Sequence, residues 1–174
     1  MNTITGKFDV PGLTIALAGN PNSGKTTIFN ALTGARQHVG NYPGVTVEKK
    51  SGWFVEDGQN HEVVDLPGTY SLTAYSLEEL VAREFLVDQR PNVVIAVVDA
   101  SNLERNLNLV VQLMEMGVPM VVALNMIDTA EARGQRIDVD ELTRMLGMPV
   151  VPTVGSRGEG MDDLVARALE VGRE

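Results

Sequence analysis

The chain of 174 residues can bury one full hydrophobic core but is short for two, so we expect a single domain over residues 1–174. Apolar residues make up 44% and charged residues 21%, a composition that excludes a disordered chain. The formal net charge of −9 opposes broad contact with nucleic acid or anionic lipid, so any phosphate site has to be made by a few directed donors. Disulfides and thiolate metal sites are excluded because the chain has no cysteine.

Short apolar runs recur along the chain and are typical of buried strands. The expected strands are Leu13–Ala18, Val45–Val55, His61–Leu66, Val93–Val98, Met120–Leu124 and Val150–Val151. The second of these alternates more loosely and is expected to be an edge strand that turns at Asp57-Gly58. All of the apolar runs are shorter than the roughly 20 residues of a membrane span. The start, MNTITGKFDVPG, lacks the features of a signal peptide, so we expect a soluble polypeptide.

Segments with helical spacing separate these runs, and glycines follow three of them as stop signals. The expected helices are Lys25–Leu32, Ser76–Val87, Leu103–Met116, Val139–Leu146 and Met161–Val171. This alternation predicts an α/β fold with a mostly parallel six-stranded sheet that has helices on both faces. Ligands of such sheets bind beyond the C-terminal ends of the strands, so chemically important motifs should follow strands.

The segment Gly19–Thr26 directly follows the first expected strand and reads Gly-Asn-Pro-Asn-Ser-Gly-Lys-Thr. This pattern is the phosphate loop of P-loop NTPases, whose backbone amides and following helix N-terminus face phosphate oxygens. Lys25 would contact the β- and γ-phosphates, and the Thr26 hydroxyl would bind Mg²⁺. The alternative is a glycine-rich turn with an incidental lysine, which the position between a strand and a helix disfavours.

Asp65-Leu66-Pro67-Gly68 ends the third expected strand. At this place Asp65 can hold Mg²⁺, usually through a water, and the Gly68 amide can reach a γ-phosphate. A D-x-x-G string alone is more often a surface turn. Its position one strand further along the same sheet edge makes it informative here.

Residues 37–46 are expected to form a long connection without its own secondary structure. Within it, Thr46 is the hydroxyl best placed to reach Mg²⁺ when GTP is bound and to leave when the γ-phosphate is lost. The alternative is that Thr46 is an ordinary strand residue. Tyr42 is expected to be a partly exposed anchor.

Asn125-Met126-Ile127-Asp128 follows the fifth expected strand and predicts guanine binding. One carboxylate can accept both N1–H and N2–H of guanine, whereas adenine would leave Asp128 unpaired. Asn125 is expected to contact the other edge of the base and to brace the phosphate loop. Helix capping by Asp128 is the alternative. After the sixth strand, a backbone amide of Thr153–Arg157 can reach guanine O6, which is the least specific of these elements.

Two further strings carry a family resemblance: Val39–Glu48 (VGNYPGVTVE) and Asp65–Leu72 (DLPGTYSL). With the motifs above, the chain resembles the N-terminal G domain of FeoB ferrous-iron transport proteins, in the translation-factor-related branch of P-loop GTPases. The resemblance implies a GTP-hydrolysing regulatory domain on the cytosolic side of the bacterial inner membrane, in a protein that takes up Fe²⁺. It also implies helical and transmembrane domains downstream, so this chain is expected to be an excised piece or a truncated member.

Departures from common GTPase patterns affect the expected activity. Thr69 stands where Ras-type enzymes have the glutamine that orients water, which predicts slow hydrolysis. The resemblance implies that Asn22 binds an activating K⁺, although a turn-stabilising role fits the sequence equally well. Met126 replaces a common lysine, and residues 153–157 lack the usual S-A-K pattern.

The expected site residues follow from the motifs and the resemblance together. The expected nucleotide-binding residues are Gly19, Asn20, Pro21, Asn22, Ser23, Gly24, Lys25, Thr26, Thr27, Asp65, Gly68, Asn125, Met126, Asp128, Val154, Gly155 and Ser156. The expected catalytic residues are Asn22, Lys25, Thr46 and Gly68; Mg²⁺ is assigned to Thr26, Thr46 and Asp65, and K⁺ to Asn22.

Three rival functions stay open at this point. A free-standing ribosome-assembly or tRNA-modification GTPase would need a basic RNA-facing surface, which the acidic composition does not supply. A P-loop ATPase or kinase is disfavoured by Asn125 and Asp128. A switch that binds GTP but barely hydrolyses it remains compatible with Thr69. The expected partners are guanine nucleotide and the downstream domains, without nucleic acid, and a homo-oligomer is left open.

Overall fold

The computed structural model describes residues 11–174, and the N-terminal segment 1–10 used above lies outside the described residues. A seven-stranded sheet runs through the molecule in the order β2-β3-β4-β1-β5-β6-β7. The strands are β1 (Pro11–Gly19), β2 (Gln37–Asn41), β3 (Glu48–Glu56), β4 (Gln59–Asp65), β5 (Val93–Asp99), β6 (Met120–Asn125) and β7 (Val150–Pro152). The five strands from β4 to β7 are parallel, and β2 and β3 add an antiparallel edge.

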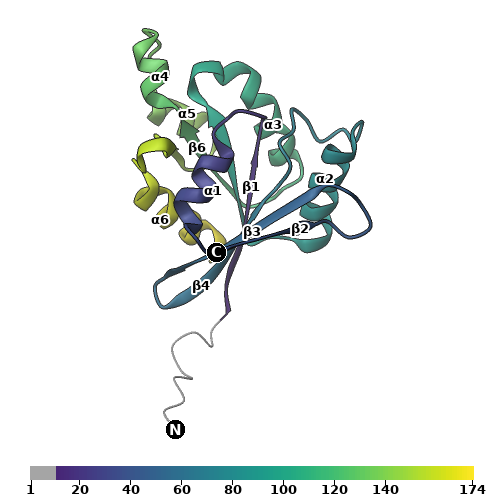
Figure 1. Ribbon diagram of the computed structural model, residues 1–174. Coiled ribbons are helices and arrows are strands. Elements are labelled where there is room, and N and C mark those ends of the chain that lie inside the picture. Colours follow the sequence, from purple (N-terminus) through teal and green to yellow (C-terminus); the bar gives the residue numbers. More distant parts are fainter. Residues whose placement is uncertain (1–10) are drawn as a thin grey trace.

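Helices cover both faces of the sheet (Figure 1). The helices are α1 (Lys25–Thr33), α2 (Leu77–Gln89), α3 (Leu103–Glu115), α4 (Ile127–Ala132), α5 (Val139–Leu146) and α6 (Met161–Gly172), with short 3₁₀ turns at Ala100–Asn102 and Gly155–Arg157. One face packs under α1 and α6 through Phe29 and Leu164, and the other packs under α2, α3, α4 and α5 through Phe85 and Leu113. The predicted α/β class is therefore confirmed.

The number of strands and the structure of residues 37–46 differ from expectation. The sheet has seven strands rather than six, because Gln37–Asn41 forms β2 and pairs antiparallel with β3. This strand was missed because it is polar and lies at the exposed edge, so its backbone hydrogen bonds leave no hydrophobic pattern in the sequence. The short helix α4 was also missed, since six residues are too few for a periodic signal.

The strand order places the start of the phosphate loop at the centre of the sheet. β1 lies between β4 and β5, and Leu17 pairs with Asp65 across β1 and β4. On the other side of β1, Asp99 of β5 pairs with Asn125 of β6. The parallel strands therefore deliver the predicted motifs to one edge, at their C-terminal ends.

Candidate nucleotide site

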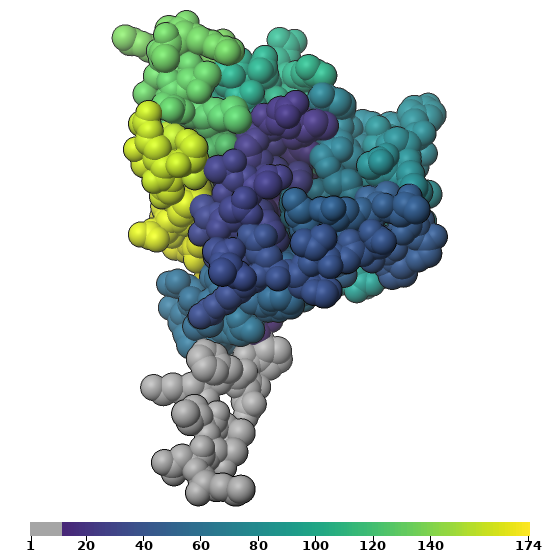
Figure 2. Space-filling model, in the orientation of Figure 1, coloured from purple at the N-terminus to yellow at the C-terminus, as the bar shows by residue number. Residues whose placement is uncertain are grey.

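The phosphate loop connects β1 to α1 through a tight backbone turn. Gly24 is the N-cap of α1 and has a left-handed backbone with φ 88°, which a residue with a side chain rarely adopts. No side chain caps this helix end, so the first amides of α1 stay available for an anion. Figure 2 shows the loop and α1, in purple, exposed on the face in view.

A groove of about 620 Å³ lies along this loop. Its lining residues are Asn20, Pro21, Asn22, Gly24, Lys25, Thr26, Thr27, Gly68 and Met126. They come from three distant parts of the chain: the phosphate loop with α1, the segment after β4, and the residue after β6. Gly68 stands close to Pro21, because a Cβ on Gly68 would be 3.3 Å from Pro21 Cα. The structure thus brings together most of the expected phosphate-binding residues.

Lys25 and Asp65 form a buried ion pair beneath the groove. Burial raises the pKa of the Asp65 carboxyl, while the charge of Lys25 opposes this rise. A buried pair of this kind is costly to break, because either charge alone would be left in a poorly solvated place. Lys25, expected to bind phosphate, and Asp65, expected to bind the metal, are therefore paired with each other in this structure.

Asn125 links the two halves of the site. Its Nδ2 donates to the Ser23 carbonyl at 3.0 Å, which is the bracing contact that the sequence predicts. Its Oδ1 accepts from Thr153 Oγ1 and from the Gly155 amide, both at 3.0 Å. A Cβ on Gly24 would overlap Asn125 Nδ2, so only glycine permits this close approach. The role of Thr153 was missed, and nothing local in the sequence indicates it.

Asp128, expected to bind the base, is more exposed to solvent than the buried pair Lys25 and Asp65. Asp128 is half-buried in α4 and lies 3.5 Å from the exposed Arg157, which also lies 3.7 Å from Glu159. In the loop after β7, Val154 and Gly155 are buried and Ser156 is exposed. Arg157 ends the segment Thr153–Arg157 that is expected to offer a backbone amide, but a lone arginine after a strand gives no signal that its side chain pairs with Asp128.

Thr46, expected to bind Mg²⁺, and Thr69, expected to make hydrolysis slow, are not among the residues that line the groove. Thr46 is exposed in the turn between β2 and β3 and is not among the lining residues. Thr69 is buried, and its amide donates to the Gly19 carbonyl at 3.1 Å. Tyr42 is buried rather than partly exposed, because its ring packs against Phe85 of α2.

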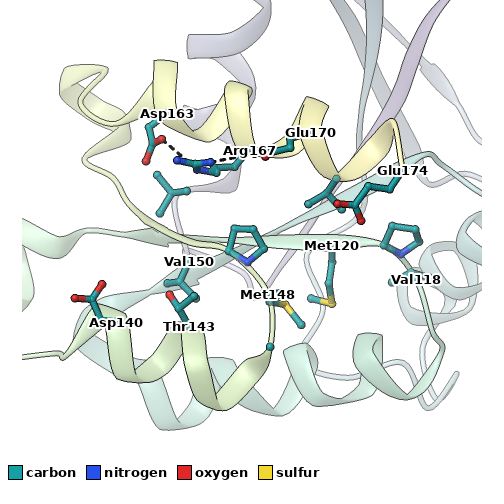
Figure 3. A pocket seen from close by; sticks show the side chains of 15 residues that line it. Val118, Met120, Asp140, Thr143, Met148, Val150, Asp163, Arg167, Glu170 and Glu174 are labelled. Carbon is teal, nitrogen blue, oxygen red and sulfur yellow. Dashed lines mark hydrogen bonds and ion pairs between the residues drawn. The ribbon is translucent and has the colours of Figure 1, made fainter.

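A larger hollow lies elsewhere and does not contain the predicted motifs. Its volume is about 890 Å³, and it lies between α5 and α6 at the N-terminal ends of β6 and β7 (Figure 3). Arg167 of α6 is held there by Asp163 at 3.6 Å and by Glu170 at 3.0 Å. Since ligands of parallel α/β sheets bind at the opposite strand ends, we assign the nucleotide site to the smaller groove.

Comparison with known sequences decides the family. The family described as "Ferrous iron transport protein B" matches residues 13–168. The chain belongs to this family. It is also similar to the Fe(2+) transporter FeoB of Salmonella typhimurium, with 57% identity over 156 residues that cover 87% of this chain and 20% of that protein. The chain therefore spans about a fifth of the length of this FeoB relative.

Solved FeoB structures share the fold. The FeoB G-domain from Methanococcus jannaschii is 45% identical, with a TM-score of 0.85, covering 94% of this chain and 99% of that one. The cytosolic domain of T. maritima FeoB, solved in a GMPPNP form, is 44% identical with a TM-score of 0.90, covering 93% of this chain and 64% of that one. The resemblance to the FeoB G domain is thus confirmed. Within residues 11–174, none of the helices has the length and apolar character needed to span a bilayer.

Proposed function

We propose that this chain is the GTP-binding and GTP-hydrolysing regulatory domain of a ferrous-iron transport protein. The observation that carries the proposal is the groove in which the phosphate loop, Gly68 and Met126 meet at the C-terminal edge of the sheet. The related T. maritima cytosolic domain, solved in GMPPNP and GDP forms, supports a guanine nucleotide as the ligand. The free-standing ribosome or tRNA GTPase is not favoured by the family match.

The triphosphate would bind along the phosphate loop. Residues 19–27 would surround the phosphates with backbone amides and the N-terminus of α1, and Lys25 would turn from Asp65 to the β- and γ-phosphates. Thr26, which lines the groove, and Asp65, released from its ion pair, fit a hard divalent cation because both offer oxygen ligands. Mg²⁺, when bound, would offset the charge that develops between the β- and γ-phosphates. Thr46 would complete this set after its turn moves.

The guanine base would lie between Met126 and the loop after β7. Asp128 would accept N1–H and N2–H, and its present partner Arg157 is exposed and easily displaced. Asn125 holds the neighbouring backbone, and the segment Val154–Ser156 would supply an amide to guanine O6. Adenine would leave the Asp128 carboxylate facing an acceptor, so GTP would be preferred over ATP.

Hydrolysis would be slow without an activator. The oxygen of a water attacks the γ-phosphorus, the bond to the β–γ bridging oxygen breaks, and GDP and phosphate leave with both protons of the water on the phosphate. Thr69 is buried and too short to orient that water as a glutamine would. The Gly68 amide would stabilise the transferred phosphoryl group, and a K⁺ held by Asn22 would add positive charge.

The role in transport is a proposal about the full-length protein. We propose that residues 1–174 form a single G domain on the cytosolic side of the inner membrane, followed by helical and membrane domains. Exchange of GTP for GDP would change the conformation of the segments around Thr46 and Gly68, and this change would control Fe²⁺ transport.

Titration calorimetry in magnesium buffer tests the nucleotide assignment. We expect heat with GTP and GDP, little with ATP, and loss of tight GTP binding in Lys25→Ala. Phosphate release should be slow in NaCl and faster in KCl. No heat with either guanine nucleotide would refute the proposed function, whereas equal rates in the two salts would refute only the K⁺ assignment.

A further inference from the structure

Tyr42 is a buried tyrosine whose hydroxyl is unpaired. The side chain is 6% exposed, and its hydroxyl has no hydrogen-bond partner among residues 11–174. Burial, and in second place the charge of Asp65, raise the pKa of this hydroxyl, so the group is a neutral donor without an acceptor. Burying such a group costs free energy, because the bond it makes to water in the unfolded chain is not replaced.

The ring of Tyr42, unlike its hydroxyl, is well packed. It meets Phe85 of α2 edge-on, with ring centroids 6.4 Å apart, and Lys49 Nζ lies 5.7 Å from its centroid. Two backbone bonds close the following turn: the Tyr42 amide donates to the Val47 carbonyl at 3.0 Å, and the Val45 amide donates to the Tyr42 carbonyl at 3.3 Å. Together these contacts hold the turn against α2.

Thr46 is not among the residues that line the phosphate groove. Thr46 lies inside the loop that the bond between Tyr42 and Val47 closes. In Figure 1 the turn between β2 and β3 lies beside α2, whereas the phosphate loop arches over the end of β1. An opening of this loop that frees Thr46 would break the bond between Tyr42 and Val47 and would disturb the packing of the Tyr42 ring on Phe85.

We propose that Tyr42 is a positioning residue whose packing on Phe85 controls how readily Thr46 enters the phosphate groove. The inference rests on the proposed function, because it concerns the GTP-dependent movement of Thr46. Ring packing stabilises the closed loop, and the unpaired hydroxyl destabilises it. In the open loop the hydroxyl regains hydrogen bonds. The packing of the ring therefore favours the closed loop and the hydroxyl favours the open loop, so the bound nucleotide can shift the balance between the two.

Two substitutions separate the effect of the hydroxyl from the effect of ring packing. They should change the affinity for GMPPNP relative to GDP in opposite directions. Tyr42→Phe keeps the ring and removes the unpaired hydroxyl, so it should stabilise the closed loop. We expect its affinity for GMPPNP to fall about five-fold, with unchanged GDP affinity and a Tm at or above that of the wild type. Phe85→Leu loosens the packing of the ring, so its affinity for GMPPNP relative to GDP should rise while its Tm falls.

Tyr75→Phe is the matched control, because Tyr75 is 92% exposed and its hydroxyl is solvated. This variant should keep the wild-type affinity for both nucleotides. Amide hydrogen exchange gives a direct second readout: Tyr42 and Val45 should be protected with GDP and should lose protection with GMPPNP.

The proposal is refuted if Tyr42→Phe and Phe85→Leu both keep the wild-type ratio of affinities. It is equally refuted if the protection of the Tyr42 and Val45 amides is the same with both nucleotides. In either case normal binding by the unaltered protein would leave the proposed function intact. Failure of the unaltered protein to bind guanine nucleotides would refute both.

Discussion

Asn125 and Ser23, which are 102 positions apart, are joined by a buried hydrogen bond of 3.0 Å from the Asn125 side chain to the Ser23 carbonyl. The same amide accepts from Thr153 and Gly155. One side chain therefore ties the phosphate loop, the end of β6 and the loop after β7 together. We infer that displacement of one of these segments is transmitted to the other two.

Asn125→Ala should destabilise the protein and weaken nucleotide binding. The substitution leaves the Thr153 hydroxyl and the Gly155 amide buried without a partner, and each unpaired group costs about 1–3 kcal/mol. We expect the free energy of unfolding in urea to fall by about 2–4 kcal/mol. Asn108→Ala is the control, because Asn108 is exposed and makes one long contact of 3.4 Å to the Tyr70 carbonyl. Wild-type stability of Asn125→Ala would contradict the bracing role.

Lys25→Met should be strongly destabilising at neutral pH, since it leaves the buried Asp65 carboxylate without its cation. We expect a loss of about 3 kcal/mol in urea at pH 7, part of which should return when Asp65→Asn is added. Burial already raises the pKa of Asp65. A carboxyl with a raised folded pKa is stabilising at low pH and loses this contribution as pH rises, so the deficit of Lys25→Met should shrink toward pH 4. Purely additive effects in the double variant would argue against the pair.

Asp128→Asn should change the nucleotide preference and leave the fold intact. The amide cannot accept both guanine donors, but it suits the carbonyl at C2 of xanthine, so affinity should move from GTP toward XTP. Competition with a fluorescent nucleotide measures this change. Glu159→Gln is the matched control, because it removes the other carboxylate near Arg157 at 3.7 Å and should leave GTP affinity unchanged. Equal GTP affinity in both variants would refute the base assignment.

Thr46→Ala should separate the two nucleotides. The residue is exposed in the turn between β2 and β3, so the free energy of unfolding should change by less than about 0.5 kcal/mol. GDP affinity should be retained while GTP hydrolysis drops at least about ten-fold, the effect of losing one group that stabilises the transition state. Parallel loss of GDP and GTP binding would show that Thr46 has no nucleotide-specific role.

His61 should make stability depend on pH. It is fully buried, its Nδ1 accepts the Leu13 amide at 2.9 Å, and its Nε2 lies 3.3 Å from the Glu56 carbonyl. Burial lowers the pKa of His61, so the unfolded chain binds the proton more readily than the folded one. The free energy of unfolding is therefore unaffected by His61 above about pH 6.5. Below that pH it decreases, by up to about 1.4 kcal/mol per pH unit.

Urea unfolding between pH 8 and pH 5 checks this expectation. The extra slope of the wild type should be absent in His61→Gln and retained in His38→Gln, because His38 is exposed at the sheet edge. Identical slopes in all three proteins would show that another group controls acid stability.

Several features could be predicted because they depend on local pattern. Val93–Val98 and Met120–Leu124 are apolar on both faces and form the buried centre of the sheet, and Val139–Leu146 forms a helix with the expected bounds. The phosphate-loop pattern between a strand and a helix places Lys25 and Thr26 in the groove. The strand at residues 37–41 could not be predicted in this way, because an exposed edge strand depends on its partner strand rather than on a pattern of its own side chains.

By itself, the sequence determined the buried strands, five of the six helices, the phosphate-loop pattern and the family, since each depends on residue types at fixed short spacings. Only the tertiary structure decided that Lys25 pairs with Asp65, that Asn125 bonds Ser23, Thr153 and Gly155, and that Tyr42 packs on Phe85 with its hydroxyl unpaired. These relationships join residues far apart in the chain. They depend on which strands become neighbours and on how burial changes the energy of a charge or a hydrogen bond, and no local spacing encodes either.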